Sequence, residues 1–278
     1  MKKLLGILVL GLLLSSNAYT ADCDGIISSN TSSIKYTCED GDELTVNKGV
    51  TVKKNWVVIS PQQNNAQNVT INNYGTIKNN GTQNANAFLG NGSGTVAINN
   101  SSTGTIQGQL GAMSIGTGDD WTIDNSGNIY GVSFKTIQVK QGDNLNVINR
   151  SGGLIRAGGE DSTTDAQVNA ILIWGINGDN SENSTIKNYG TITAAQNTIK
   201  VGSYSDNTTI TNFSGGVISN TDDDGAKAAI RIDGDNVTLT NKGTISGTNT
   251  SHSIEIGSGV TGTKIYVDGA QHSQEKLN

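Results

Sequence analysis

The sequence predicts an all-β fold: a right-handed, three-sided parallel β-helix (solenoid) of about eight or nine coils. A phrase close to V-T-I-x-N-x-G-x-I occurs seven times, and its asparagine recurs at intervals of 24 to 39 residues, most of them near 25. Each copy also contains short runs in which apolar and polar residues alternate, the period of two of a β-strand. Such short strands are stable only when like strands of successive repeats stack in parallel, and parallel crossovers are right-handed by strong preference.

Residues 1–21 have the pattern of a secretory signal peptide. Lys2 and Lys3 precede the apolar run Leu4–Leu14, and small and polar residues follow as far as Ala21. This run is much shorter than the roughly 20 apolar residues that a membrane-spanning helix needs. We therefore expect an exported bacterial chain that does not span the membrane and is either secreted or displayed at the cell surface.

Residues 22–43 show few features of the repeat and are expected to form an N-terminal cap. They contain Cys23 and Cys38, the only two cysteines of the chain. In an exported protein such a pair is oxidised far more often than it binds metal, and no further metal ligands accompany it. The sequence therefore predicts a disulfide between Cys23 and Cys38.

Residues 44–268 are expected to form the β-helix, with three strands in each coil. The first strand of a coil points its apolar residues inward, and so does the Gly-x-Ile strand that follows the asparagine. The inward residues of the first strand are Ile71, Ile98, Ile123, Val147, Ile186, Ile210 and Leu239. Those of the second strand are Ile77, Ile106, Ile129, Ile155, Ile192, Ile218 and Ile245. A third pattern, of which Met113 and Ile115 are one copy, completes the coil.

The asparagine of each phrase is expected at a corner, where it tolerates a left-handed backbone and stacks on its copies as an amide ladder. The glycine that follows would serve the same corner without steric cost. The ladder consists of Asn73, Asn100, Asn125, Asn149, Asn188, Asn212 and Asn241.

At the other end, Lys264-Ile265-Tyr266-Val267 resembles one more first strand, and a polar tail follows at residues 269–278. An uncovered end of a solenoid is a strand edge that pairs readily with another chain. This feature favours end-to-end self-association.

A second corner, just before the first strand, carries aspartates in five coils. These residues are Asp119, Asp143, Asp179, Asp206 and Asp235. Stacked carboxylates about 4.8 Å apart would repel one another unless something neutralised them. Either each aspartate accepts backbone N–H groups in its own turn, or the ladder holds structural Ca²⁺, whose hard oxygen coordination suits adjacent carboxylates. No other cofactor is expected.

The longest interval, from Asn149 to Asn188, predicts the most protruding loops. Its extra residues include Glu160, Asp161, Asp165 and Glu182. Insertions in solenoids become loops on one face, often the binding face, although many such loops are simply tolerated. These four acidic residues are the candidates for a binding loop.

The N-x-G-x-I phrase behind an exported N-terminus resembles the passenger β-helices of bacterial autotransporters and, more loosely, pectin-lyase-like folds. The resemblance covers about residues 44–268. It implies the solenoid and an adhesin-like role, but the same scaffold also carries enzymes. No pattern of long alternating strands follows residue 268, so the resemblance leaves three alternatives: a separate outer-membrane translocator as partner, a longer protein of which this sequence is a fragment, or secretion of the chain alone.

The net charge and the candidate catalytic and sugar-binding residues indicate which classes of function are expected. The formal net charge of −6 disfavours nucleic-acid binding. Asp222, Arg231, Asp233 and Asp235 faintly resemble the sites of polysaccharide hydrolases and lyases, but the histidines that would complete such a motif are missing. Trp56, Trp121 and Trp174 occupy different repeat positions, so no sugar-stacking platform is predicted. We expect an adhesive or structural binding protein without catalytic residues, whose extracellular ligand is a carbohydrate or a protein; the alternative is a polysaccharide lyase or hydrolase.

Overall fold

A computed structural model describes residues 20–61, 67–81, 86–90, 94–158, 168–176, 180–221, 227–248 and 252–268. Within these ranges all regular structure is β-strand, arranged in two sheets of ten strands and one of nine. Every pairing between neighbouring strands is parallel, as the pairs β8–β11 and β9–β12 illustrate. The predicted β-solenoid is confirmed.

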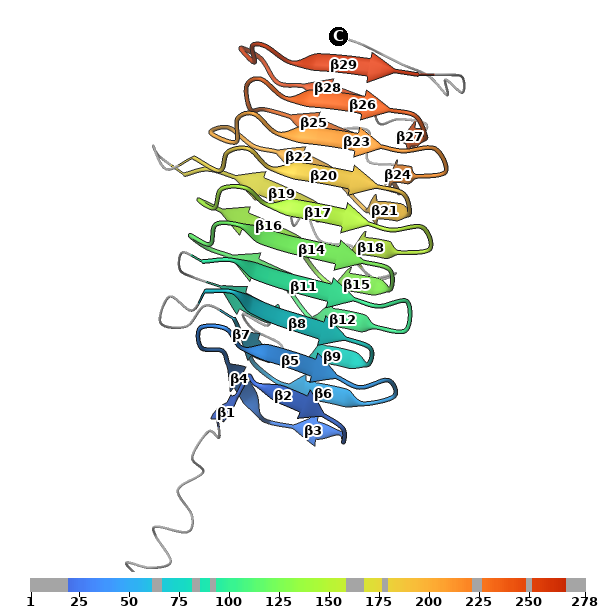
Figure 1. Ribbon diagram of the computed structural model, residues 1–278. Helices are drawn as coiled ribbons and strands as arrows, with labels where there is room; N and C mark the ends of the chain where they lie inside the picture. The colour runs from blue at the N-terminus through green and yellow to red at the C-terminus, as the bar shows by residue number, and fades with distance from the viewer. Residues whose placement is uncertain are drawn as a thin grey trace, which may run out of the picture.

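Each sheet takes one strand from every coil, in sequence order (Figure 1). Sheet A contains β1 (Thr20–Asp22), β4 (Lys35–Thr37), β7 (Ile59–Ser60), β10 (Asn86–Gly90), β13 (Gly111–Ile115), β16 (Ile137–Lys140), β19 (Ile171–Trp174), β22 (Ile199–Val201), β25 (Ala228–Ile232) and β28 (His252–Ile256). Sheet B contains β2 (Gly25–Ile27), β5 (Glu43–Val46), β8 (Val69–Asn73), β11 (Val96–Asn100), β14 (Trp121–Asn125), β17 (Asn146–Asn149), β20 (Thr185–Asn188), β23 (Thr209–Asn212), β26 (Thr238–Asn241) and β29 (Lys264–Val267). Sheet C contains β3 (Thr31–Ser32), β6 (Thr51–Lys54), β9 (Thr76–Asn79), β12 (Thr105–Gly108), β15 (Asn128–Gly131), β18 (Leu154–Ala157), β21 (Thr191–Ala194), β24 (Val217–Asn220) and β27 (Thr244–Ser246).

The coil is right-handed. In Figure 1 the strands of sheet B run from left to right in front, and the chain returns behind them while it climbs toward the C-terminus. This is the hand that right-twisted parallel strands prefer.

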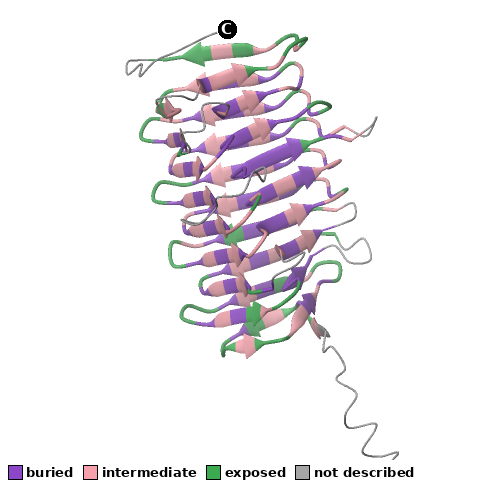
Figure 2. Ribbon diagram, turned by 180° about the vertical axis from the view of Figure 1, so that it is seen from behind, coloured by how far each residue is buried: buried purple, intermediate pink, exposed green. Residues whose placement is uncertain are grey.

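The core is a stack of inward columns. Strands of sheets B and C show buried positions alternating with half-buried ones. Seen from behind in Figure 2, the strands that face the viewer carry this alternation as purple and pink bands. Ile71, Ile98 and Ile123 are register partners in consecutive coils, and each is fully buried. Burying a side chain of this size contributes roughly 1.5–3 kcal/mol relative to leaving it exposed. The repeated phrase therefore provides a substantial part of the apolar core, and the inward residues of sheet A, such as Phe88 and Met113, add to it.

The asparagine ladder is continuous. The side-chain Nδ2 of each member donates to the Oδ1 of the next, at 2.7–2.9 Å, across all six steps from Asn73 to Asn241. The first six asparagines are at most 2% exposed. A buried amide loses its water, so these bonds and those to nearby carbonyls satisfy groups that would otherwise be costly.

The backbone of this corner differs from the expectation. None of the seven ladder asparagines has a positive φ. The glycines are required for close approach instead: a Cβ on Gly127 would lie 2.2 Å from the carbonyl oxygen of Ser101, and one on Gly190 would lie 2.3 Å from that of Gly153. The prediction of a left-handed backbone was wrong here because the asparagines end a strand and point inward.

Both ends of the stack continue the three sheets. Within residues 22–43, expected as a cap, β2 pairs with β5 and β3 with β6 in the same parallel arrangement as elsewhere. This segment is thus built as the first coil, and the architecture does not change at residue 43. At the other end β29 pairs with β26 and places Lys264 beside Thr238, as expected for a further first strand.

The predicted signal peptide, residues 1–21, and the predicted polar tail, residues 269–278, lie outside the described residues, apart from Thr20 and Ala21. Among the residues that the structure describes, no helix is long and apolar enough to cross a membrane.

Candidate functional site

A groove of about 360 Å³ lies on the outer face of sheet A, across β10, β13 and β16. Its lining combines apolar, polar and cationic side chains and includes neither a carboxylate nor a histidine. The lining residues are Trp56, Val57, Asn86, Leu89, Leu110, Gly111, Met113, Ser114, Phe134, Lys135, Gln138 and Lys140.

The floor of the groove follows from strand register. Leu89, Ser114 and Gln138 are register partners in consecutive coils. They alternate with the inward residues Phe88, Met113 and Ile137, which are fully buried, and therefore face outward.

The rim comes from the turns that lead into sheet A. Trp56, Leu110 and Phe134 each stand three residues before an inward residue of the next strand, Ile59, Met113 and Ile137 respectively. They therefore occupy one repeat position in three coils.

Two of these rim side chains expose aromatic surface. Trp56 is 53% exposed and Phe134 is 40% exposed. The buried Asn79 fixes the turn of Trp56, because its Nδ2 donates to the carbonyl oxygen of Trp56 and, at 3.0 Å, to that of Asn86. Exposed aromatic rings beside a groove are typical of binding surfaces.

The groove is cationic. Lys135 and Lys140 make no ion pair within the described part of the chain. Partial burial lowers the pKa of Lys135, and the positive charges of Lys140 and Lys200 lower it further. The amide Nε2 of Gln138 is buried and has no acceptor among the described residues. The site thus offers donors and positive charge without a matching anion.

The sequence analysis placed Met113 and Ile115 on the inward side of this sheet, but it missed the rim of the groove. The three tryptophans do not share a repeat position, because Trp121 is a buried core residue of β14 and Trp174 ends β19. Comparing them with one another therefore did not reveal that Trp56 shares its position with Leu110 and Phe134. The available signal was the spacing of three residues between an exposed apolar side chain and the first inward residue of sheet A.

The residues considered for polysaccharide catalysis form an ion-pair network further along sheet A. Arg231 Nε lies 3.0 Å from both oxygens of Asp233, and its Nη1 donates to Glu255 Oε1 at 2.8 Å. Lys200 Nζ lies 3.6 Å from Asp233 Oδ2. The hydrogen bond to Asp233 raises the pKa of Arg231, so this guanidinium stays protonated and is a poor general base. Asp235 lies at the aspartate corner, and Asp222 is outside the described residues.

The aspartate corner is held by hydrogen bonds between coils. Asp119, Asp143, Asp206 and Asp235 each use Oδ1 to accept a backbone N–H of the following coil, at 2.6–2.9 Å. The residue after each is left-handed, with φ between 54° and 59° at Asp120, Asn144, Asn207 and Asn236. The carboxylates thus bond the next coil rather than their own turn.

One member of this corner differs from the prediction. The N–H group that Asp143 binds belongs to Glu182, and the left-handed residue of that coil is Asn183, with φ of 57°. Glu182-Asn183 therefore occupies the position that had been assigned to Asp179-Asn180. The error arose because the long insertion shifts the register by three residues; Asp179 itself lies outside the described residues.

Of the candidate binding loop, Glu160, Asp161 and Asp165 are also outside the described residues. Glu182 accepts a hydrogen bond from Asn180 at 2.7 Å and has the corner role just described.

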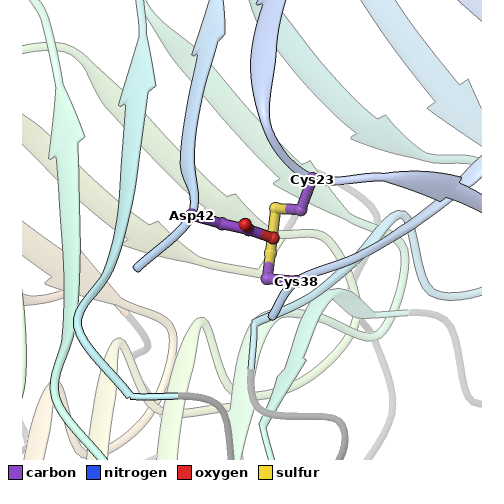
Figure 3. Close-up of side chains that lie close together, drawn as sticks. All are labelled: Cys23, Cys38 and Asp42. Atoms are coloured by element: carbon purple, nitrogen blue, oxygen red, sulfur yellow. A yellow bond between two sulfur atoms is a disulfide. The ribbon is translucent and has the colours of Figure 1, made fainter. Parts of the chain in front are cut away.

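The predicted disulfide between Cys23 and Cys38 is confirmed, and both cysteines are fully buried. The carboxyl group of Asp42 lies beside it (Figure 3), close enough that these three residues are the one group of potential metal ligands among the described residues. The two sulfur atoms are joined to each other, and Asp42 Oδ2 accepts the N–H of Glu39 at 2.6 Å. This arrangement is structural: closing a loop of this length stabilises the folded state by about 3 kcal/mol. The described corner aspartates, Asp119, Asp143, Asp206 and Asp235, do not form such a group of three potential ligands.

Comparison with protein-family models, with curated proteins and with solved structures finds no match to this chain.

Proposed function

We propose that this chain is an exported β-solenoid, secreted or displayed at a cell surface, that binds an extracellular ligand through the groove of sheet A and does not catalyse a reaction. The observation that carries this proposal is the rim of exposed aromatic side chains beside two lysines that have no ion pair among the described residues. A folded protein rarely exposes aromatic rings at a built groove unless something packs on them.

The composition of the groove supports binding over hydrolysis. Glycoside hydrolysis usually needs two carboxyl groups on either side of the scissile bond, and none of the lining side chains carries one. The carboxylates of the ion-pair network, Asp233 and Glu255, are committed to Arg231.

Binding is tested with immobilised polymers of one backbone: dextran, carboxymethyl-dextran, dextran sulfate and cationic diethylaminoethyl-dextran. We expect the wild-type protein to retain at least one of them, and Trp56→Ala with Phe134→Ala to abolish that retention. Tyr74→Ala, which removes an exposed ring from the corner after β8, is the matched control and should bind normally. Retention that survives loss of both rim residues would refute the groove as the binding site.

Catalysis and export are tested separately. Incubation with a polysaccharide that yields new reducing ends or unsaturated sugars, and no such products with Asp233→Ala, would overturn the non-catalytic part of the proposal.

For export, the full chain is expressed in a bacterium and the N-terminus of the recovered protein is determined by mass spectrometry. We expect it to begin after Ala18 or after Ala21; an intact Met1 on protein confined to the cytoplasm would contradict export.

A further inference from the structure

We infer that the ligand of this groove is an acidic polysaccharide, a chain of sugar rings that carry carboxylate or sulfate groups; this inference rests on the proposed function and specifies its ligand. Its basis is the charge of the groove and how that charge is distributed along sheet A.

The cations are not isolated. Lys135 and Lys140 line the groove, and Lys200 is close enough for its charge to act on Lys135, although its ammonium group also lies 3.6 Å from Asp233 Oδ2. Lys200 stands on β22, two coils beyond Gln138 of β16, through the register pairs Gln138–Leu172 and Leu172–Lys200. Two coils correspond to about 10 Å along the stack. Cationic side chains spread over such a length, two of them without an ion pair among the described residues, match a polymer better than a single small anion.

Exposed aromatic side chains lie along sheet A beside these lysines. Lys140 is the register partner of Trp174, which is 40% exposed. Together with Trp56 and Phe134, this places ring surfaces beside ammonium groups from the groove toward β19. A sugar ring presents an apolar face of C–H groups and a polar edge, so one acidic sugar unit can use both kinds of side chain.

A hydrogen-bond donor in the groove also suits an acidic sugar. Gln138 Nε2 in the groove has no acceptor among the described residues, and a carboxylate or sulfate oxygen would supply one. Charged acceptors bind N–H groups roughly twice as strongly as neutral ones.

An acidic peptide is the less suitable partner. Extended peptides commonly bind by adding a strand to a free sheet edge. The strands under the groove have no such edge, because β10 pairs with β7 and β13, and β16 pairs with β13 and β19. Recognition must therefore come from side chains, which suits a polysaccharide.

The test compares affinities for dextran, carboxymethyl-dextran, dextran sulfate and poly-glutamate at low and high NaCl, with wild-type protein and the double variant Lys135→Gln/Lys140→Gln. We expect binding of one or both acidic dextrans and no binding of neutral dextran. The double variant should weaken binding by about tenfold or more, as expected for loss of hydrogen bonds to a charged group. High NaCl should weaken wild-type binding, because about 1 M salt shortens the screening length to about 3 Å.

The outcomes separate the two proposals. Lys187→Gln, which removes an outward lysine from sheet B, is the matched control and should bind as wild type. Binding of neutral dextran as tightly as of the acidic forms, or equal affinity in the lysine variant, would overturn the inference, while loss on Trp56→Ala would still support the groove. Tighter binding of poly-glutamate than of either acidic dextran would overturn the polysaccharide assignment. No binding in any arm would contradict both proposals.

Discussion

At the scale of single residues, the asparagine ladder shows how one side chain can specify a repeat. Asn125 accepts hydrogen bonds from Asn100 Nδ2 at 2.7 Å and from the N–H of Gly127 at 3.2 Å, and it donates to Asn149 Oδ1 at 2.8 Å. Its partners Asn100, Gly127 and Asn149 are buried, and only the carbonyl oxygen of Leu154, which Nδ2 also approaches at 3.3 Å, belongs to a half-buried residue.

We expect Asn125→Ala to lower the free energy of unfolding by about 2–4 kcal/mol, because it leaves several buried polar groups without partners. Urea unfolding followed by circular dichroism measures this loss. Asn99→Ala is the matched control, because Asn99 pairs with Asn72 in an exposed ladder and should change stability by less than about 1 kcal/mol. Equal losses in the two variants would contradict a special role for the buried amides.

Lys135 makes the stability of the protein depend on pH, because its surroundings disfavour the charged form of its side chain. Burial, Lys140 and Lys200 lower its pKa in the folded state, so charging it costs more when folded than when unfolded. This cost is fully present well below the lowered pKa. It is relieved as the pH rises through the lowered pKa toward the unfolded-state value, so stability increases with pH in that window.

Lys135→Met should therefore stabilise the protein at about pH 7 in low salt, by on the order of 0.5 kcal/mol once solvent screening of this half-exposed group is allowed for. The advantage over wild type should shrink near about pH 10, where unperturbed lysines begin to lose their protons. The same variant should bind acidic dextran more weakly. Reduced stability at both pH values would instead assign Lys135 a role in holding the fold.

At the scale of the strand and its turn, the coils are held together by corners that differ in physical character. At the asparagine corner the chain passes so close to the previous coil that no Cβ fits at Gly127. At the aspartate corner, left-handed residues alternate with carboxylates that accept N–H groups from the next coil. Each kind of corner predicts its own response to substitution.

Gly127→Ala should destabilise the protein by at least about 2 kcal/mol, because the added Cβ would collide with two backbone carbonyl groups that cannot easily move. Gly152→Ala should cost only about 1 kcal/mol. Gly152 has a φ of 80° but open space around its Cβ position, so the cost is conformational alone. Thermal unfolding of both variants tests this order, and a larger loss for Gly152→Ala would contradict the close-approach explanation.

The aspartate corner also leads to a prediction about calcium. Since Oδ1 of Asp119, Asp143, Asp206 and Asp235 already accepts an N–H, we expect the melting temperature to stay flat as CaCl₂ is raised into the millimolar range at constant ionic strength. An ion that bound only the folded state would raise it with occupancy. A rise with Ca²⁺ that Mg²⁺ does not reproduce would restore the calcium hypothesis, and Asp143→Asn should then remove it.

Across the whole molecule, the sequence predicted the architecture far better than the site. Repetition at about 25 residues and the alternation around Ile71 or Ile98 are local patterns, and stacking translates them directly into three parallel sheets. The register failed only at Glu182, where the long insertion interrupts the repeat.

The groove could not be predicted in the same way. Trp56, Leu110 and Phe134 lie 54 and 24 residues apart in sequence and meet only because the coils stack. Which turn residues face outward, and how far they are exposed, depends on the packing of the turns rather than on the strand period. A composite surface of this kind is a property of the assembled solenoid.

The central claim, that a ligand lies in the groove of sheet A, is tested most directly by acrylamide quenching of Trp56 fluorescence. A Trp174→Phe chain retains exposed Trp56 and buried Trp121, so its accessible signal reports on the rim of the groove. The control chain carries Trp56→Phe, Trp174→Phe and Tyr74→Trp, which moves the reporter to the corner after β8. We predict that saturating acidic dextran protects Trp56 from quenching and leaves the tryptophan at position 74 unprotected. Unchanged quenching of Trp56 by a saturating ligand, or equal protection of both reporters, would contradict the claim.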